Sequence, residues 1–359
     1  MAFNSVIESD VDRIVADLGP LLDRFSATTV LVTGANGFVC SYIVDVLARW
    51  NERAPSPCTV LAMDNMVTGK VDRLAHLVGR DDIRFVRHDV TKPFATDLAA
   101  DWMVHGASIA SPTVYRAYPL ETLDANINGT RHLLELAKVS RAKGALLLSS
   151  SEIYGDPDPA FLPTPETYRG NVSCSGPRAC YDESKRLAET LGYIYFNYFK
   201  VPVTVVRPFN VFGPGQPITD GRIIPDLMKS ALNKEPITLL SDGKATRRFC
   251  YISDFIRAIM TLWVEEKSHG EAFNVGNDEI EISVKDLSER MCAVAAEVYG
   301  EACMTVVSAR SEDRNYTTDN PQRRCPDLAK IRKTIGYQPQ VGLDEGLKRT
   351  LLSYLEGRK

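Results

Sequence analysis

Short apolar runs alternate with longer amphipathic stretches through most of the chain. The runs that favour strands are at 29–33, 59–64, 83–86, 102–105, 145–149 and 203–207, with a later one at 272–275. Apolar residues at helical spacing fill most of the gaps, notably at 38–50, 119–140 and 180–199. Strands that are apolar on both faces and separated by helices are typical of a parallel sheet with helices on both sides. We therefore expect an α/β fold with a doubly wound parallel sheet.

The two ends of the chain have patterns of their own. Residues 5–25 place apolar side chains at helical spacing, with a break at Gly19-Pro20. We expect an amphipathic leader, residues 1–28, that packs onto the body or onto a partner subunit. After Arg207 the chain becomes irregular, and helical patterns return near 222–233, 253–266, 283–298 and 343–356. We expect a smaller second domain over the carboxyl ends of the strands, where ligands of open α/β sheets bind.

Composition narrows the classes of partner. The 359 residues carry a net charge of −4, which gives no reason to expect a nucleic acid. The eight cysteines are scattered, with no Cys-x-x-Cys and no zinc-like spacing, so we expect reduced thiols and no metal. Glu8, Asp10 and Asp12 are unlike the basic start of a signal peptide, and no apolar run approaches the ~18 residues of a membrane helix. These features predict a soluble cytoplasmic protein.

A glycine turn between the first strand and the first long helix predicts a dinucleotide site in a Rossmann-type sheet. In the segment VLVTGANGFVCSYIVDVL, Gly34 permits the tight turn and Gly37 lets the backbone approach a pyrophosphate at the helix N-terminus. The second strand ends at Asp64, whose carboxylate accepts ribose hydroxyls and repels a 2′-phosphate, so NAD is favoured over NADP. Cys40 replaces the third glycine of the usual pattern, and we expect slightly looser packing there. Asp89 is a further candidate for a contact near the adenine. The alternative interpretation of Gly34 and Gly37 is a glycine turn that binds no ligand.

A tyrosine and a lysine four positions apart raise the question of a catalytic base. Tyr181 and Lys185 share one face of the predicted helix 180–199. A free tyrosine, with a pKa of about 10, is a poor base at neutral pH, but a nearby ammonium and a positive nicotinamide favour the phenolate. The strand at 145–149 leads into Ser149, Ser150 and Ser151, which supply the hydroxyl expected beside such a base. A plain surface pair is the alternative, and the glycine turn upstream argues against it.

Longer motifs show which proteins the chain resembles. From about residue 28 to the C-terminus they include TGANGFV, HDV, HGASIASP, SSSEIYGDP, GPRACYDESKRLAE, RPFNVFGPG, DGKATRRFCYISD, FNVGN and NPQRRCPD. On these motifs the chain resembles the extended short-chain dehydrogenase/reductases, the NAD-dependent epimerase/dehydratase family of nucleotide sugars. Within that group it is most similar to the UDP-glucuronate decarboxylases, also called UDP-xylose synthases. The resemblance implies a Rossmann-type NAD-binding domain, a smaller C-terminal α/β substrate-binding domain and a UDP-sugar substrate.

The resemblance also implies roles for individual residues. The implied catalytic residues are Tyr181, Lys185, Ser150, Glu152 and Arg324. The implied contacts to NAD come from Gly34, Asn36, Gly37, Phe38, Val39, Asp64, Asn65, Asp89, Val90, Ala107, Ser108, Tyr181 and Lys185. The implied contacts to the substrate come from Ser111, Glu152, Arg178, Asn210, Arg222, Arg247 and Arg324. The guanidinium forks of Arg222 and Arg247 suit a diphosphate. A departure is Arg248, where the decarboxylases usually have a small residue.

The implied reaction starts with oxidation of the sugar at C4, where Tyr181 takes the hydroxyl proton. A ketone β to the C6 carboxylate then lets CO2 leave, and return of the hydride gives UDP-xylose, unless the 4-keto pentose is released. Glu152 and Arg324 are implied near the carboxylate and in proton delivery. Their structural alternatives are a strand-end carboxylate bound to backbone amides and an ordinary salt bridge.

Two positions separate this reaction from those of related enzymes. Ser151 stands where a 4,6-dehydratase of this kind would carry an aspartic acid, and Glu152 where a 4-epimerase usually has a small or hydroxyl residue. A 4-epimerase or 4,6-dehydratase is the alternative within enzymes. A non-catalytic NAD-binding regulator is the alternative from another class, and the presence of the tyrosine, lysine and serine argues against it.

The pattern of the chain and its resemblance to the family also predict the domains and the assembly. We expect the leader 1–28, an NAD-binding domain of 29–207 with 252–278 returning to it, and a nucleotide-sugar domain of 208–251 and 279–359. Helices near 113–139 and 180–199 carry apolar residues beyond one stripe, namely Leu133, Leu134, Leu136, Leu187, Leu191, Tyr195 and Phe199. Because related enzymes pair these helices, we expect a homodimer.

Overall fold

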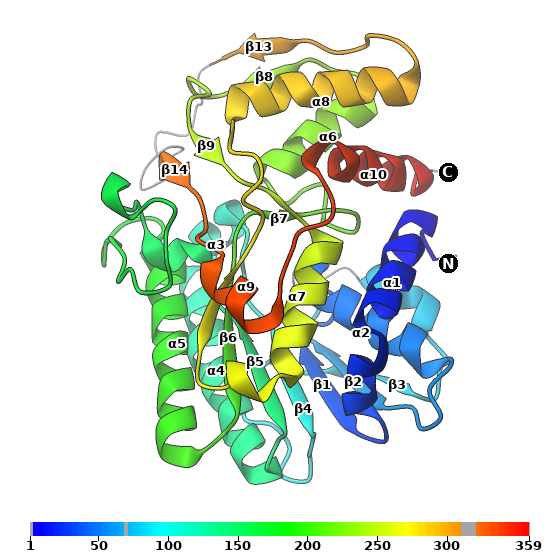
Figure 1. The fold of residues 1–359 in the computed structure, drawn as a ribbon, viewed down its shortest axis with the longest axis vertical. Coiled ribbons are helices and arrows are strands. Elements are labelled where there is room, and N and C mark those ends of the chain that lie inside the picture. The colour runs from blue at the N-terminus through cyan, green and yellow to red at the C-terminus, as the bar shows by residue number, and fades with distance from the viewer. Residues whose placement is uncertain (1–2, 68–70, 310–320, 359) are drawn as a thin grey trace.

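Seven parallel strands form the centre of the molecule in the computed structural model, which describes residues 3–67, 71–309 and 321–358. The strands are β1 (Thr29–Thr33), β2 (Thr59–Asp64), β3 (Ile83–Arg87), β4 (Trp102–His105), β5 (Gly144–Leu148), β6 (Val203–Pro208) and β11 (Ala272–Val275). Their order is β11-β6-β5-β4-β1-β2-β3, and each neighbouring pair is parallel (Figure 1). The order reverses between β1 and β4, where open α/β sheets bind ligands. The predicted Rossmann-type α/β fold is confirmed.

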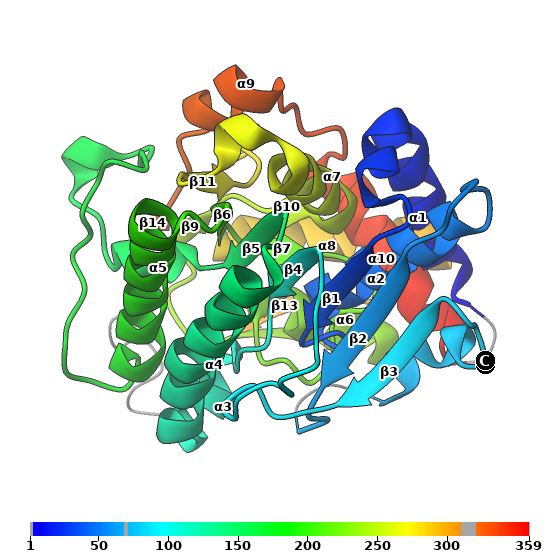
Figure 2. The same cartoon turned by 90° about the horizontal axis from the view of Figure 1, so that it is seen from below.

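Helices cover both faces of this sheet. Helices α2 (Phe38–Asn51) and α7 (Ile252–Val264) lie on one face, and α4 (Pro119–Ser140) and α5 (Ala179–Phe199) lie on the other (Figure 2). Successive strand residues point to opposite faces, so Val30 and Val32 of β1 pack with α2 while Leu31 between them packs on the side of α4. The strands are therefore apolar on both faces because both faces are covered.

One group of residues predicted at a subunit interface belongs to this core instead. Leu133 and Leu134 are fully buried and Leu136 and Tyr195 are nearly so, and all four pack beneath α4 and α5 against the sheet. A helix lying between a sheet and a neighbouring helix needs an apolar face wider than one stripe, which explains the extra leucines. The exposed apolar side chains of α4 and α5 are others. They are Leu120, Leu123, Val139, Leu187, Tyr193, Tyr198 and Phe199.

A second group of elements follows β6, and most of it lies above the sheet in Figure 1. Its helices are α6 (Ile223–Asn233), α8 (Val284–Tyr299), α9 (Ala329–Ile335) and α10 (Leu343–Glu356). Its strands are β7 (Val211–Phe212), β8 (Ile237–Leu239), β9 (Thr246–Arg247), β10 (Cys250–Tyr251), β12 (Ile282–Ser283), β13 (Val306–Ser308) and β14 (Arg323–Arg324). They pair as β10-β7, β12-β9-β14 and β13-β8. The four helices predicted after Arg207 are confirmed as α6, α7, α8 and α10.

Shorter helices complete the described chain. They are α3 (Pro112–Ala117) and the 3-10 helices η1 (Gly19–Phe25), η2 (Val71–Leu77), η3 (Ser151–Tyr154), η4 (Pro159–Phe161) and η5 (Glu266–Ser268). Within the described residues no helix is long and apolar enough to cross a membrane. All eight cysteines are free thiols. The predicted division into a cofactor domain and a sugar domain at the residue numbers given above stays a prediction.

The leader forms helix α1 (Ser5–Leu18) and ends at the predicted Gly19-Pro20 break. Asn4 caps its start, because its side chain accepts a hydrogen bond from Ile7 N. Its apolar stripe, which includes Val11 and Ile14, is buried against α2, α7 and α10. Of the two predicted positions for the leader, the structure therefore shows packing onto the body.

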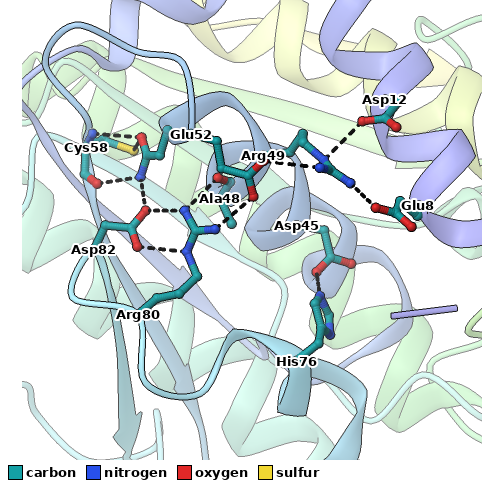
Figure 3. A network of polar contacts seen from close by, with 11 residues as sticks. Glu8, Asp12, Asp45, Ala48, Arg49, Glu52, Cys58, His76, Arg80 and Asp82 are labelled. Atoms are coloured by element: carbon teal, nitrogen blue, oxygen red, sulfur yellow. Dashed lines mark hydrogen bonds and ion pairs between the residues drawn. The ribbon is translucent and has the colours of Figure 1, made fainter. Parts of the chain in front are cut away.

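Charged side chains of α1 reach two different parts of the molecule. Arg49 of α2 binds Glu8, and its Nε lies 3.0 Å from Asp12 Oδ1 (Figure 3). Buried Asp10 instead accepts hydrogen bonds from Arg349 Nη2 of α10 at 2.8 Å and from the Tyr251 hydroxyl at 2.6 Å. The leader thus ties the NAD-side helix α2 to the C-terminal helix α10.

Candidate active site and family

The turn after β1 has the shape that a dinucleotide phosphate requires. Gly34 has φ of +71°, and a Cβ built on it would lie 2.7 Å from Ala107 N and 2.8 Å from Ala107 Cα. The ends of β1 and β4 can approach this closely only because residue 34 lacks a side chain. Gly37 is the N-cap of α2, so the helix N-terminus with its unpaired amides begins at this turn. An anionic pyrophosphate is the ligand that such a helix start stabilises.

Asp64 ends β2 beside this turn. Its buried carboxylate accepts hydrogen bonds from Asn36 N at 3.0 Å and from Met66 N at 2.8 Å. These amides fix the carboxylate and leave lone pairs that can accept ribose hydroxyls. In the part of the chain that the structure describes, buried Ser108 Oγ and Asn36 Oδ1 have no hydrogen-bond partner, which a polar ligand would supply. The predicted residues therefore fit the adenosine and phosphates of NAD.

Cys40 does not loosen the helix, contrary to the prediction. Its Sγ packs against Gly106 so closely that a side chain at 106 would overlap it, and the thiol is buried. The missing glycine of the helix is compensated by a glycine on the facing strand end, which keeps helix and sheet close. Burial raises the pKa of the Cys40 thiol to about 12, so the group is neutral at physiological pH.

The other predicted cofactor residues lie along the same edge of the sheet. Phe38 and Val39 are half-buried in the first turn of α2, and Asn65 follows Asp64 directly. Val90 is buried, whereas Asp89 is exposed and its Oδ1 accepts the backbone N–H two residues on. Contact between each of these residues and the cofactor stays a prediction.

Tyr181, Lys185 and Ser150 come together at the end of β5. The Tyr181 side chain is buried, and the Ser150 hydroxyl lies near enough to its phenol to lower the pKa of Tyr181. Lys185 Nζ donates to Leu148 O at 2.7 Å and lies 5.7 Å from the centre of the Tyr181 ring. One helix face thus places the predicted base and its lysine beside the serine-ended strand.

Burial dominates the pKa values of this group. It raises the pKa of Tyr181 to about 12, although the Ser150 hydroxyl and the charge of Arg222 lower it. It also lowers the pKa of Lys185 to about 8. The protein's own groups therefore do not produce the predicted low tyrosine pKa. A bound nicotinamide ring, which is positive in its oxidised form, would add a further charge that favours the phenolate.

Glu152 lies between two arginines from distant parts of the chain. Arg324 of β14 binds Glu152 Oε1, and Arg178, just before α5, binds Glu152 Oε2. Burial opposes ionisation, but Arg324 and Arg178 outweigh it and hold the pKa of Glu152 at about 2. Glu152 is thus a carboxylate at physiological pH, which can accept a proton but has none to give. A strand-end carboxylate bound mainly to backbone amides, the alternative reading, does not describe these contacts.

Three more predicted substrate residues surround this cluster. Arg247 of β9 stands in register with Arg324 of β14, and burial together with the Arg324 charge lowers the pKa of Arg247 to about 10. Arg222 binds the Asp220 carboxylate through Nε at 2.9 Å and Nη2 at 2.6 Å. Ser111 Oγ donates to the Asp220 carbonyl at 2.6 Å. Asp220, which was not predicted, therefore joins Ser111 to Arg222.

A hydrogen bond joins Asn210 to the backbone of Arg248. Asn210 has φ of +42° and its Nδ2 donates to Arg248 O at 2.9 Å. The Arg248 guanidinium points to Glu281, with Nη2 and Oε2 3.8 Å apart. The arginine that departs from the decarboxylase pattern thus has an acidic neighbour within this chain.

Sequence reasoning missed one aromatic neighbour of the base. Tyr115 of α3 stacks on Tyr181, with ring centres 5.1 Å apart and an angle of 10° between the rings. No local pattern marks Tyr115, because the contact joins helices that are distant in sequence. Among the described residues there is no group of three or more His, Cys, Asp or Glu that could hold a metal.

Known proteins resemble this chain in sequence. The pattern of the family described as the NAD dependent epimerase/dehydratase family matches residues 30–276. UDP-glucuronic acid decarboxylase 2 of Arabidopsis thaliana is 39% identical over 94% of this chain and 71% of its own length. UDP-glucuronic acid decarboxylase 1 of Xenopus tropicalis is 37% identical over 90% of this chain and 71% of its own.

Solved structures share the fold. The epimerase Mth375 of Methanothermobacter thermautotrophicus has a TM-score of 0.79 and 26% identity, with 96% of both chains covered. UDP-glucuronic acid 4-epimerase of Bacillus cereus, in complex with UDP-glucuronic acid and NAD, has a TM-score of 0.73 and 26% identity, covering 91% of this chain and 99% of its own. The glycine turn, Asp64 and the Tyr181–Lys185 helix agree with an NAD cofactor. The chain belongs to the NAD dependent epimerase/dehydratase family.

Proposed function

We propose that this protein is a UDP-glucuronate decarboxylase. The observation that carries the proposal is the ionised Glu152 between Arg178 and Arg324, close to the Tyr181 and Lys185 pair. Two guanidinium groups that already bind one carboxylate have the charge and the fork geometry to bind a second, that of a uronic acid. The similarity to curated UDP-glucuronic acid decarboxylases supports the same substrate.

The first step needs a base at the sugar 4-hydroxyl. Tyr181 takes this proton, with the Ser150 hydroxyl beside it to hold the sugar oxygen. Lys185 is fixed by the Leu148 carbonyl near the ring, and its charge favours the phenolate. Bound NAD+ supplies the hydride acceptor for C4 and later the hydride that is returned.

The ketone formed at C4 is β to the C6 carboxylate, which makes loss of CO2 possible. The electron pair of the C5–C6 bond passes into a C4–C5 enolate as CO2 leaves, and C5 then takes up a proton that comes from solvent. Arg324 and Arg178 hold the carboxylate region, and positive charge beside it also stabilises the enolate oxygen. Because Glu152 is ionised, we assign it to orienting the arginines and substrate and not to donating the C5 proton.

The nucleotide part of the substrate suits the remaining basic residues. Arg222 and Arg247 are proposed to bind the diphosphate, with Asn210 and Ser111 at the sugar or first phosphate. Arg222 lowers the pKa of Tyr181, and the charges of Tyr181 and Glu152 act to raise the pKa of Arg222, which supports a place for Arg222 at the reacting end. We also propose that residues 29–207 and 252–278 form the NAD-binding domain and that residues 208–251 and 279–359 form the domain that binds the nucleotide sugar.

A 4-epimerase acting on UDP-glucuronate is the second candidate. The similarity to the Bacillus cereus UDP-glucuronic acid 4-epimerase supports it, since the Tyr181 step is common to both reactions. Incubation with UDP-glucuronate and NAD+, followed by mass analysis, separates the two. We expect CO2 and UDP-xylose or the UDP-4-keto pentose. UDP-galacturonate without CO2 would make the epimerase the correct reading.

The Tyr181→Phe variant tests the assignment of the base. We expect CO2 release to fall by at least about 100-fold, because the group that takes the 4-hydroxyl proton is lost. NAD binding, measured by titration, should stay within about threefold, because Gly34, Gly37 and Asp64 are untouched. Near-normal turnover in this variant would overturn the assignment.

A homodimer and a cytoplasmic location complete the proposal. The exposed apolar side chains of α4 and α5 support the dimer, since adjacent helices then offer one apolar surface. The free thiols support a reducing compartment, and cell fractionation with a specific antibody would test it.

A further inference from the structure

A buried polar network lies behind the catalytic residues. At its centre, the Arg207 guanidinium of β6 binds both carboxylate oxygens of Glu189, through Nε at 2.9 Å and Nη2 at 2.6 Å. Its remaining nitrogen, Nη1, donates to the Tyr154 hydroxyl at 2.6 Å and to Glu166 O at 3.1 Å. The Arg207 side chain is only 11% exposed and Glu189 15%, so both charges lie largely out of solvent and each depends on its partner.

The network holds two elements that carry the proposed catalytic groups. Glu189 lies one helical turn beyond Lys185 and two beyond Tyr181, on the same face of α5. Its carboxylate also accepts a hydrogen bond from the Ser149 hydroxyl, at the end of β5. Arg207 thus joins the helix of the base to the strand end that leads into Ser150.

The segment between Ser149 and Tyr154 is held at both ends by this network. Ser149 is bound through Glu189, and Tyr154 through Arg207 and through Asn274 Oδ1, which accepts from the Tyr154 hydroxyl at 2.7 Å. Ser150 and Glu152 lie between these two points, Ser150 as the N-cap of the 3-10 helix η3 and Glu152 within it. Four of the five N–H donors of Arg207 are bound inside the protein, and its side chain is largely buried, so we assign Arg207 no contact with the sugar.

We propose that Arg207, acting through Glu189 and the Tyr154 hydroxyl, is a positioning residue that holds the Ser150–Glu152 turn in register with Tyr181 and Lys185. The proposal rests on the proposed function for the roles of Ser150 and Glu152. A Tyr→Phe change at 154 removes one end of this support and leaves the buried ring, which packs near Phe209 and Tyr168. The turn would keep its fold but lose its fixed place.

The experiment compares Tyr154→Phe with a matched control, Tyr168→Phe. Tyr168 lies in the same aromatic cluster, and its hydroxyl accepts only from Asp158 N at 3.3 Å among the described contacts. We expect Tyr154→Phe to lower kcat by about tenfold or more with KM for UDP-glucuronate within about twofold, and Tyr168→Phe to keep wild-type values. Wild-type kcat in Tyr154→Phe, or equal losses in both variants, would overturn the proposal.

A double variant separates positioning from a general loss of structure. Because the support positions Glu152 as well as Ser150, Tyr154→Phe should cause a clearly smaller fold loss of CO2 release in a Glu152→Ala background than in the wild type. Losses that multiply would refute the inference. Ser149→Ala gives an independent variant at the other end of the turn and should show the same kcat loss if Tyr154→Phe does not fold.

The proposed function and the positioning role fail in different ways. Wild-type enzyme that releases no CO2 refutes the decarboxylase. The ratio of variant to wild-type turnover, measured on whichever product the wild type forms, tests the positioning role in either case.

Discussion

Glu152 is charged because two arginines outweigh the cost of burying it. Its pKa falls from an ordinary 4.5 to about 2, so the ionised form is favoured in the folded protein. The stability that follows is fully present above pH ~4.5 and is lost as the pH falls through about 2. This stabilisation is on the order of 2 kcal/mol, which is less than the full pKa shift would give. The Glu152 side chain is 23% exposed, so solvent screens part of its attraction to the two arginines.

A Glu152→Gln variant tests whether the ionised Glu152 contributes this pH-dependent stability. Glutamine keeps the shape and an acceptor oxygen but has no proton to titrate, so part of the wild type's loss of stability between pH 5 and pH 3 should be absent. Urea unfolding of both proteins at the two pH values gives the measurement. Parallel loss of stability in the two proteins would mean that Glu152 is not held ionised by Arg178 and Arg324.

For single residues, the sequence predicts which side chains take part in the chemistry better than it predicts which side chains they contact. Tyr181, Lys185 and Ser150 lie together because short motifs encode them within one strand–helix unit. The partners of Glu152 could be named but not paired, since Arg178 and Arg324 are distant in sequence and meet only through β14. Tyr115 and Asp220 carry no motif, and Cys40 was misjudged because the glycine that makes room for it, Gly106, follows β4 and is far from α2 in the sequence.

Among the elements, α1 is the one whose place the sequence left open between body and partner. Its central contact is Asp10, which is fully buried, and burial outweighs the hydrogen bond from Tyr251 and the charge of Arg349 to raise its pKa. The ion pair therefore specifies how α1 docks more than it adds net stability. Removal of Asp10 alone is destabilising, because the buried Tyr251 hydroxyl is left without its acceptor and Arg349 without its nearest carboxylate.

We expect Asp10→Ala to lower the free energy of unfolding by about 3 kcal/mol, because the buried Tyr251 hydroxyl loses its acceptor and Arg349 loses its nearest carboxylate. Asp12→Ala is the matched control on the same helix. Its carboxylate is 56% exposed beside Arg49, so its loss should cost at most about 0.5 kcal/mol. Equilibrium denaturation of the two variants provides the comparison. Equal effects would show that the Asp10 contact does not anchor α1.

The strands and long helices were predictable because the spacing of apolar residues along each of them matches the positions that are buried. The two-residue strands β7, β9, β10, β12 and β14 were not, because so short an element has no period of its own. These short strands place Arg247 and Arg324. The substrate side of the site therefore depends on tertiary pairing that local pattern cannot show, while the cofactor side follows from β1, its glycine turn and α2.

At the scale of the whole molecule, the predicted dimer depends on the surface made by α4 and α5. The leucines predicted there, Leu133, Leu134 and Leu136, are core residues and cannot form a second interface. Leu123 and Leu187 are exposed by 37% and 42% on helices that pack side by side (Figure 2). A dimer that pairs these helices with their copies would bury both side chains, and with them Leu120 and Tyr193.

A charge placed in that surface should therefore separate the subunits. We expect wild-type protein at micromolar concentration to have twice the 39.8 kDa mass of the chain by light scattering, and the Leu123→Arg, Leu187→Arg double variant to have the monomer mass. Two arginines per subunit would be desolvated in the paired interface, which costs several kcal/mol. Val78→Arg is the control, since Val78 is 71% exposed and follows η2 on the NAD side. A wild-type monomer, or a double variant that remains dimeric, would contradict pairing through α4 and α5.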